Sequence, residues 1–599
     1  MKKRVADIII ETLLDLGIEN CFCVVGGGAM HINNALKVHD KMKVMFCHHE
    51  QACAFAAEGY AKYSGKMALV SVTSGPGGVN TLNGVYSAWV DSTPMFVLAG
   101  HPRSDTTIEA TGLNLRCRGV QEFDIISSIK NMTKYSKLVL DAREIKKEII
   151  KSYNIAMSGR RGPVWLSIPL DIQSTIIDES ELLEYEPEQY DNFEDFDSND
   201  VIDRIKKANS PCILTGSAIR IADAYDGFRT FIDKVQIPVV GAALSSDILP
   251  EGFPLYYGMS GNIGPRTGNY ILQNSDLILV LGNSLSVRQT GFDPKKFAPN
   301  AYFIMVDAQK DEMLKPDLHI DNKINTDINL FFNKMNSSIK EIITAPKKWI
   351  DYCDNAYKLL NNIDDPVVKE ESRVPAKCFW KVFRNKIEDN AVLALGNSNC
   401  VIGIYQYGVS KTGQRVITNT NAGSMGYDIP EAVGISAVSE NPVYCITGDG
   451  SVMMNLQELE TIAYNNLNIK LVIFSNNGYG AIRQTCKNYF KGEIFGCDDT
   501  SGVGMPEFKK IANAFDFKYM CCNTNRELDE CLDEFIESKE RIILEVKQLL
   551  DDPVIPKLMS KMNENGVFEA PDFTSFYPFL DDEVLEKLNF RREGEENGL

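Results

Sequence analysis

Two short polar motifs stand at the ends of apolar segments in the last third of the chain. Gly448-Asp449-Gly450 follows the apolar run 443–447, and Asn476-Asn477 follows the run 469–474. Apolar residues recur at helical spacing over 455–466, so the pattern predicts a strand, a helix and a second strand. Such a unit makes the strands parallel and usually adjacent. Both motifs are therefore expected at one carboxyl edge, where open α/β sheets bind ligands.

These residue types suit a magnesium ion that is bound together with a diphosphate. Mg²⁺ prefers oxygen ligands in a near-octahedral shell and usually shares them with phosphates. Asp449, the amide oxygen of Asn476 and the backbone carbonyl of Gly478 could supply three ligands. Glycines allow close backbone approach to phosphates, and a hydroxyl near a helix start favours anions, which points to Gly448, Gly450 and Ser451. Either motif alone is also compatible with an ordinary turn.

Composition limits the class of protein. The chain has 599 residues, 44% of them hydrophobic, which is enough for about three or four domains. It has no apolar run of the ~18 residues that a membrane span needs, and the amphipathic pattern over 1–17 lacks a signal peptide's apolar core. A net charge of −19 disfavours nucleic-acid binding. The 15 cysteines have no metal-ligand spacing and suggest reduced thiols. We expect a cytoplasmic enzyme without membrane or nucleic-acid partners.

Helical and apolar strand patterns alternate in three parts of the chain, which predicts the α/β class with three doubly wound parallel-sheet domains. Expected strands include 68–72, 95–99 and 164–168 in the first unit, and 212–215, 238–240, 277–281 and 302–306 in the second. The predicted divisions are an N-terminal domain 1–178, an acidic linker 179–200, a central domain 201–345, a linker 346–374, a C-terminal domain 375–548 and a tail 549–599.

Four further groups of motifs occur along the chain. They are Cys47-His48-His49-Glu50-Gln51-Ala52 with Ala57-Glu58-Gly59-Tyr60-Ala61, Thr73-Ser74-Gly75-Pro76-Gly77-Gly78-Val79-Asn80, Gly162-Pro163-Val164 with Ile168-Pro169-Leu170-Asp171, and Gly423-Ser424-Met425-Gly426-Tyr427. With the magnesium motif, they make nearly the whole chain resemble thiamine diphosphate enzymes, and among these the acetohydroxyacid (acetolactate) synthases of the pyruvate oxidase group. The resemblance implies pyrimidine-binding, central and diphosphate-binding domains.

The resemblance also implies roles for individual residues. Glu50 would drive the cofactor's aminopyrimidine into its imino form, which removes the thiazolium C2 proton, although a glutamate at a helix start can serve the helix dipole alone. Met425 would support the bent cofactor, although it could be an ordinary core methionine. Gly27 and Gln121 are further catalytic candidates. The other cofactor contacts implied are Ser74, Pro76, Asn80, Gly396, Asn397, Ser398, Asn399, Gly423, Ser424, Gly448, Asp449, Gly450, Ser451, Asn476, Gly478 and Tyr479, with Asp449, Asn476 and Gly478 on the metal.

The expected reaction is transfer of a two-carbon unit rather than release of an aldehyde. Simple pyruvate decarboxylases carry a His-His pair where this chain has Val120-Gln121-Glu122. Gln121 matches a glutamine that the synthases place against the cofactor, although it could also be a surface residue. A decarboxylase or oxidase of a 2-oxo acid remains an alternative. An inactive relative would be expected to lack Glu50, Asp449 or Asn476, and all three are present.

Two differences between this sequence and the synthases concern the acceptor of the two-carbon unit. Ala481 and Thr485 replace a methionine and a tryptophan that shape the synthase pocket beside Ile482, which predicts more space. The stretch 101–118 carries Arg103, Arg116 and Arg118, and arginine forks suit phosphate or carboxylate groups. The combination resembles synthase-like proteins of bacterial surface polysaccharides, so acetolactate and an acetyl-branched nucleotide sugar are both open as products. The arginines could equally lie in solvent or in surface salt bridges.

The cofactor and subunit requirements beyond thiamine diphosphate and Mg²⁺ are implied by the family alone. The synthases bind FAD in the central domain, and Tyr257-Gly258-Met259-Ser260-Gly261-Asn262 with Gly282 and Arg288 partly matches that site, whereas 283–287 does not. FAD therefore stays open. In the family, the counterparts of Glu50 and Asp449 in one site come from different chains, which implies a homodimer or homotetramer.

Overall fold

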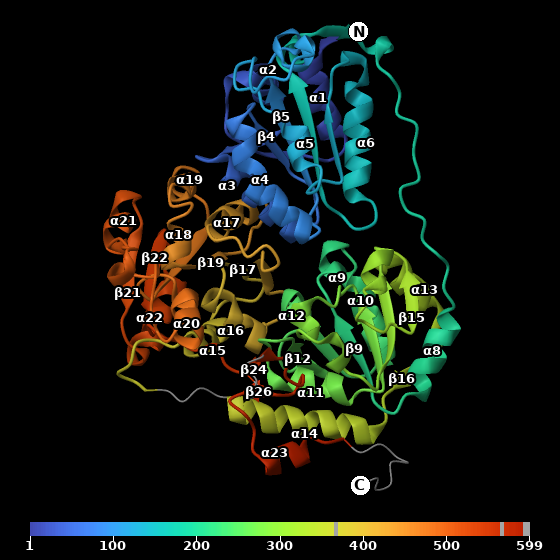
Figure 1. The fold of residues 1–599 in the computed structure, drawn as a ribbon, viewed down its shortest axis with the longest axis vertical. Helices are drawn as coiled ribbons and strands as arrows, with labels where there is room; N and C mark the ends of the chain where they lie inside the picture. The colour runs from blue at the N-terminus through green and yellow to red at the C-terminus, as the bar shows by residue number, and fades with distance from the viewer. Residues whose placement is uncertain (365–368, 563–567, 591–599) are drawn as a thin grey trace.

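Three six-stranded sheets organise the chain, and all their strand pairs are parallel. The computed structural model describes residues 1–364, 369–562 and 568–590 (Figure 1). In the view of Figure 1 the N-terminal sheet lies at the top, the C-terminal sheet at the left and the central sheet at the right. The predicted fold class is confirmed. Parts of the predicted linker 346–374 and tail 549–599 lie outside the described residues.

The N-terminal sheet has the order β3-β2-β4-β5-β7-β6. Its strands are β2 (Asn20–Cys23), β3 (Lys43–Phe46), β4 (Leu69–Val72), β5 (Met95–His101), β6 (Tyr135–Leu138) and β7 (Pro163–Pro169). The main helices around it are α1 (Val5–Asp15), α2 (Met30–Val38), α3 (Glu50–Ser64), α4 (Pro76–Val90), α5 (Ile125–Ile129), α6 (Ile145–Met157) and α7 (Leu170–Ser174). Strands β4, β5 and β7 are buried along their whole lengths, as their apolar sequences predict.

The C-terminal sheet repeats that order as β18-β17-β19-β20-β22-β21. Its strands are β17 (Val392–Leu395), β18 (Arg415–Thr418), β19 (Val443–Gly448), β20 (Ile469–Ser475), β21 (Lys518–Cys522) and β22 (Ile542–Lys547). Its helices are α15 (Ala376–Lys386), α16 (Asn399–Tyr407), α17 (Asp428–Ser436), α18 (Asp449–Val452), α19 (Glu458–Tyr464), α20 (Gly480–Tyr489), α21 (Phe508–Ala514) and α22 (Leu528–Glu537).

The central sheet has a different order, β12-β11-β9-β13-β14-β15, which reverses direction at β9. Its strands are β9 (Pro211–Thr215), β11 (Val239–Ala242), β12 (Tyr256–Ser260), β13 (Leu277–Leu281), β14 (Tyr302–Asp307) and β15 (Asn322–Asn325). Its helices are α8 (Ser198–Lys207), α9 (Ala218–Ile221), α10 (Tyr225–Lys234), α11 (Arg266–Asn274), α12 (Val287–Thr290) and α13 (Ile328–Ser338). Within the predicted linker 346–374, α14 (Lys347–Asp364) buries Trp349 in the same core.

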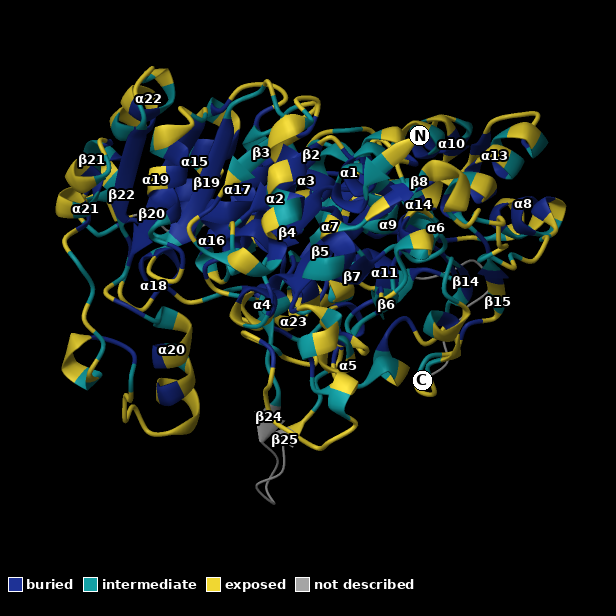
Figure 2. Ribbon diagram, turned by 90° about the horizontal axis from the view of Figure 1, so that it is seen from above, coloured by how far each residue is buried: buried dark blue, intermediate teal, exposed yellow. Residues whose placement is uncertain are grey.

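Helices α3 and α17 cross closely and join the N-terminal and C-terminal sheets. A Cβ on Gly434 would lie 1.8 Å from the carbonyl oxygen of Ala56, and one on Gly59 would lie 2.5 Å from that of Glu431. Only residues without side chains permit this backbone approach. One apolar core consequently contains residues from both domains, including Val70 and Leu471. Figure 2 shows α3 and α17, both mostly buried, side by side.

Two local predictions differ from the structure at their ends. The predicted helix 1–17 begins only at Val5, because Lys2–Arg4 forms β1 and pairs antiparallel with β8 (Ile176–Asp178). That partner is far away in sequence, so a local pattern cannot show it. The predicted helix 455–466 is the shorter α19, and a separate turn of helix, α18, begins at Asp449. Nowhere in the described chain is there a helix with both the length and the apolar character that membrane crossing requires.

Candidate active site

The two polar motifs meet at the carboxyl edge of the C-terminal sheet, as predicted. Strands β19 and β20 are parallel neighbours with Gly448 opposite Phe474. Asp449 and Asn476 therefore follow these strands side by side. The Asp449 carboxylate accepts hydrogen bonds from the backbone N–H groups of Gly450, Asn476 and Gly478 at 2.9, 2.9 and 3.0 Å. The loop after β20 is thus folded around this carboxylate.

Three oxygen groups here, the Asp449 carboxylate, the Asn476 amide oxygen and the Gly478 carbonyl, fit a hard cation. Asp449 is 2% exposed, and burial raises its pKa to about 6 against the opposing effect of the N–H donors. The side-chain oxygen of Asn476 is buried without a hydrogen-bond partner in the structure. The Gly478 carbonyl accepts one hydrogen bond, from the Gly480 N–H, which leaves a second lone pair. A cation would satisfy the amide oxygen and offset the desolvation of the carboxylate, so these residues fit Mg²⁺.

Of the three glycines in the two motifs, Gly450 and Gly478 allow close packing of the backbone. A Cβ on Gly450 would lie 2.3 Å from the Tyr479 ring, and one on Gly478 would lie 2.0 Å from the Cys497 carbonyl oxygen. Gly478 also has a φ of 124°, in the region that favours glycine. Gly448 has more space, since its nearest neighbour would be the Cys400 sulfur at 3.9 Å.

A cleft of about 1,080 Å³ opens beside these motifs, and we call it the C-domain cleft. Segments that follow β17, β19 and β20 line it, together with the start of α20. It brings together most of the predicted residues of this domain: Asn397, Ser398, Asn399, Met425, Gly448, Asp449, Gly450, Ser451, Asn476, Gly478, Tyr479, Ala481 and Ile482. Met425 is 37% exposed, so its side chain is not an ordinary core methionine.

Two predicted serines use their hydroxyls within the protein. Ser451 donates to the Asp428 carboxylate at 2.9 Å and accepts from the Gly426 N–H at 2.8 Å. Ser424 donates to the side-chain oxygen of Asn83 in α4, also at 2.9 Å. Ser451 therefore ties the turn before α17 to α18, and Ser424 ties that turn to the N-terminal domain.

Ser424 and three other predicted residues lie outside the lining of the C-domain cleft. Gly396 faces the Asp428 carboxylate, to which a Cβ would approach within 2.4 Å. Gly423 forms a turn with a φ of 65°. Thr485 is exposed, and its hydroxyl donates to the Ala481 carbonyl in the preceding turn of α20. The predicted pocket positions thus divide, because Ala481 and Ile482 line the cleft and Thr485 does not.

The predicted N-terminal residues form a second group, which we call the N-domain cluster, at the carboxyl edge of their own sheet. Glu50 begins α3, and its carboxylate accepts from the Asn80 side chain at 3.0 Å. The loop Thr73–Gly77 lies between the other members: Gly28 donates to the Thr73 hydroxyl at 3.0 Å, and a Cβ on Gly75 would lie 2.3 Å from the Gln121 carbonyl. Gly27, Ser74 and Pro76 belong to these same loops.

Within one chain, no residue of the N-domain cluster lines the C-domain cleft. Among the described residues, every residue that lines the cleft belongs to 397–552. Glu50 and Gln121 are therefore outside it. The chain forms both groups of residues that the sequence predicts to act together, but only one of the two groups lines the cleft.

The stretch that carries the three arginines folds largely onto itself. Arg103 forms a two-pronged ion pair with Asp105, at 3.1 and 3.0 Å. Arg118 donates to the carbonyls of Asp105 and Thr107 at 3.0 and 3.1 Å. Arg116 is exposed. Two of the three guanidinium groups thus have local partners, as surface arginines commonly do, and none of the three lines the C-domain cleft.

Sequence reasoning missed several residues of the cleft, above all those that follow β22. The missed residues are Cys400, Phe474, Gly480, Gln484, Gln548, Leu550 and Asp552. Burial raises the pKa of Asp552 to about 6, and its carboxylate accepts from the Ala376 N–H at the start of α15 and from Asn399. The signal was available, since β22 neighbours β20 and the chain must leave it at the same carboxyl edge.

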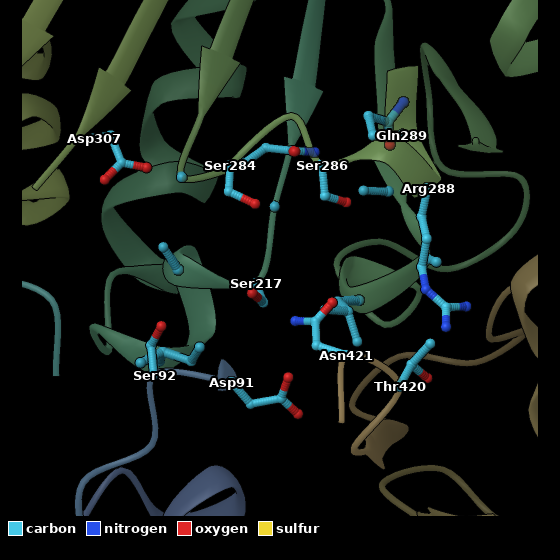
Figure 3. Close-up of a pocket in the computed structure, with 18 of the residues that line it drawn as sticks. Asp91, Ser92, Ser217, Ser284, Ser286, Arg288, Gln289, Asp307, Thr420 and Asn421 are labelled. Carbon is cyan, nitrogen blue, oxygen red and sulfur yellow. The ribbon is translucent and has the colours of Figure 1, made fainter. Parts of the chain in front are cut away.

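A second cavity, of about 1,380 Å³, lies where the three domains meet (Figure 3). Asp91 and Ser92 reach it from the N-terminal domain, and Thr420 and Asn421 from the C-terminal domain. The remaining lining comes mostly from loops after the central strands, including Ser217, Ser284, Ser286, Arg288 and Asp307. Burial raises the pKa of Asp307 to about 6. Of the residues that partly match a flavin site, Ser260, Gly261, Asn262, Gly282 and Arg288 line this cavity.

Comparison with known proteins gives one consistent result. Residues 3–125, 198–335 and 396–546 match the N-terminal, central and C-terminal domain models of thiamine pyrophosphate enzymes. The acetolactate synthase large subunit of Lactococcus lactis is 26% identical over 94% of this chain and 95% of its own length. The probable acetolactate synthase large subunit of Methanococcus aeolicus is 28% identical over 90% and 91%, and isozyme 1 of Escherichia coli is 27% identical over 92% and 95%.

Proposed function

We propose that this chain, which belongs to the thiamine pyrophosphate (thiamine diphosphate) enzymes as an acetolactate synthase-like member, is a Mg²⁺-dependent carboligase. It removes CO₂ from a 2-oxo acid, with pyruvate as the donor, and transfers the two-carbon unit to an acceptor carbonyl. The observation that carries this proposal is the buried pair of Asp449 and the unsatisfied Asn476 oxygen at the edge of the C-domain cleft.

The chain's own residues have separable tasks in this proposal. Asp449, Asn476 and the Gly478 carbonyl hold Mg²⁺, and Met425 supports the cofactor from the cleft wall. Thiamine diphosphate, when bound, supplies a carbon nucleophile and an acceptor for the electrons released with CO₂. Glu50 holds a proton at the cofactor's pyrimidine ring. The mostly apolar lining, with Phe474, Ile482 and Leu550, limits water, which favours ligation over protonation of the two-carbon unit.

We propose that a second copy of the chain completes each site. In this arrangement the N-domain cluster of one copy covers the C-domain cleft of the other, so a homodimer is the smallest active unit and a homotetramer is also compatible. Exposed apolar side chains support such a contact, since Phe46 and Val120 near the cluster are 57% and 83% exposed and Phe495 after α20 is 89% exposed.

Two acceptors are compatible with the cleft. Ala481 in the cleft wall leaves space for an acceptor larger than a 2-oxo acid, which supports an acetyl-branched nucleotide sugar. The local pairing of Arg103 and Arg118 gives that acceptor no added support. Acetolactate is supported by the relatives, which are an acetolactate synthase and a probable acetolactate synthase.

FAD is the ligand that we propose for the cavity between the three domains. Five of the residues that partly match a flavin site line it, and serine hydroxyls with Arg288 offer donors for a diphosphate. A purified protein with flavin absorbance would support this assignment, and a colourless protein that takes up no added FAD would refute it.

The test of the proposed function is a mass-spectrometric product assay. The purified protein is incubated with labelled pyruvate, thiamine diphosphate and Mg²⁺, with and without a panel of nucleotide-linked keto sugars. Acetolactate or a sugar that gains an acetyl unit would support a carboligase and identify the acceptor. Free acetaldehyde or oxygen consumption without a ligation product would favour the decarboxylase or oxidase alternative, and no turnover with any donor would favour an inactive relative.

A further inference from the structure

The side chain of Arg483 is buried in a helix that is otherwise largely exposed. It lies in the first turn of α20, where its neighbours Ala481 and Ile482 are exposed and Arg483 itself is 5% exposed. Burial of a guanidinium group is costly unless its donors are paired. The partners of Arg483 therefore indicate what the burial achieves.

Those partners come from three segments that surround the proposed metal loop. Nη2 donates to the carbonyl of Asn476 at 2.6 Å and to that of Leu550 at 2.8 Å. Nη1 donates to the carbonyl of Asn477 at 3.3 Å and to the Asp498 carboxylate at 3.4 Å. One side chain thus joins two successive peptide carbonyls of the loop to the segment after β22 and to residue 498.

The loop has a shape that requires such support. Asn477 and Gly478 have φ values of 62° and 124°. Asparagine enters the left-handed region more readily than most residues, but it still favours the right-handed region, so neighbouring contacts help to select this shape. The carbonyls of Asn476 and Asn477 belong to the peptides on either side of the Asn477 Cα. The Arg483 guanidinium group donates to both carbonyls and thereby restricts φ and ψ of Asn477.

The opposite side of the same loop faces the Asp449 carboxylate. The N–H groups of Asn476 and Gly478 donate to Asp449, while the Asn476 side-chain oxygen is buried without a partner. The backbone dihedrals at Asn477 therefore set where the Asn476 and Gly478 oxygens lie relative to Asp449. The charge of Arg483 is balanced locally by Asp498, so it acts through geometry and is not itself a ligand.

We propose that Arg483 is a positioning residue that holds the loop 476–479 in its metal-binding shape. This rests on the proposed function, since the metal is the Mg²⁺ of the thiamine diphosphate site. Lysine cannot replace it fully, because an ammonium group is a point donor and lacks the planar fork that reaches two carbonyls at once.

The experiment measures Mn²⁺ binding by electron paramagnetic resonance, with Mn²⁺ as the probe for the Mg²⁺ site and with thiamine diphosphate present. The variants are Arg483→Gln and Arg483→Lys. The matched control is Lys487→Gln, because Lys487 lies one turn further along α20 and pairs with Asp551 of the segment after β22 without touching the loop. Thermal unfolding of each variant without ligand is recorded alongside.

We expect Arg483→Gln to weaken Mn²⁺ binding by about 10- to 100-fold, the usual effect of losing a residue that orients metal ligands. Arg483→Lys should give a smaller loss and Lys487→Gln none. Should Arg483→Gln not fold, Arg483→Lys carries the same test. Unchanged Mn²⁺ binding in a folded Arg483 variant, with or without a lowered unfolding temperature, would overturn the proposal. A wild-type protein that binds no Mn²⁺ with thiamine diphosphate would instead overturn the proposed function.

Discussion

The N-terminal and C-terminal domains share one topology and carry different chemistry. Counted along each domain, both sheets have the strand order 2-1-3-4-6-5. The chain leaves the third strand through Thr73-Ser74-Gly75 in one domain and through Gly448-Asp449-Gly450 in the other. After the fourth strand it continues with Pro102 in the first and Asn476 in the second.

This comparison shows that the topology supplies a ligand-binding edge and the residues decide its use. The C-terminal edge has a buried carboxylate beside an unsatisfied amide oxygen, which suits a cation. The N-terminal edge has a glutamate that is only partly buried and hydrogen-bonded to Asn80, which suits proton transfer. The helices that follow the second strand in each domain, α3 and α17, are the pair that cross.

The largest effect is expected from Asp449→Asn, which removes the cation-binding character of the C-terminal edge. Turnover should fall on the order of 10³-fold or more, because charge stabilisation by the metal is lost. Mn²⁺ binding with thiamine diphosphate should be lost as well. Asp551→Asn, which removes an exposed carboxylate outside the cleft lining, is the control and should keep both properties. Retained Mn²⁺ binding in Asp449→Asn would refute the metal assignment.

Glu50→Gln should affect the opposite edge alone. We expect a loss of turnover of about 10²- to 10⁴-fold, the range for a missing proton-transfer group. Mn²⁺ binding should stay near that of wild type, because Glu50 is not in the C-domain cleft. Single-turnover decarboxylation of labelled pyruvate measures the first property. A parallel loss of Mn²⁺ binding would mean that the two edges do not divide the work as described.

Gly434→Ala tests the helix crossing that joins the domains. The added methyl would lie 1.8 Å from the Ala56 carbonyl, so the helices must separate. The free energy of unfolding should fall by about 3 kcal/mol, as for overpacking in a rigid core. Gly504→Ala is the matched control, because nothing lies within 4 Å of its Cβ position. Equal stability of the two variants in urea titrations would contradict the close crossing.

The smallest expected effect is a pH dependence at the same crossing. Burial raises the pKa of Glu58 to about 7, against the opposing effect of Lys62, while Asp91 raises it further; the buried Glu431 faces the same cluster from α17. The folded protein thus keeps a proton that the unfolded chain loses near pH 4.5, so stability falls as pH rises from about 4.5 to 7.

In Glu58→Gln, the decrease in the free energy of unfolding over this pH range should be smaller by about 1–3 kcal/mol, because glutamine has no proton to retain. Urea unfolding of both proteins at pH 5 and pH 7.5 measures the difference. A wild-type protein that becomes more stable relative to Glu58→Gln as the pH rises would show that the sign is wrong.

Local sequence patterns predicted much of the fold and about half of the candidate site. Alternating apolar runs located the strands, and residues after β17, β19 and β20 line the C-domain cleft as expected. Contacts between distant segments were not predictable: Asp552 reaches α15, Ser424 reaches Asn83, and β1 pairs with β8. Thr485 does not line the cleft, although it lies one helical turn after Ala481, and its hydroxyl donates to the Ala481 carbonyl. The role of Arg483 depends on carbonyls whose direction no sequence pattern encodes.

The central claim is that Glu50 of one copy and Asp449 of another act in one site. It is tested most directly by mixing Glu50→Gln and Asp449→Asn chains that are co-expressed with different tags. Each variant alone should be inactive, and random dimers should recover about a quarter of wild-type activity, because half are mixed and each mixed dimer has one intact site. Isolated mixed oligomers without recovered activity would contradict the account.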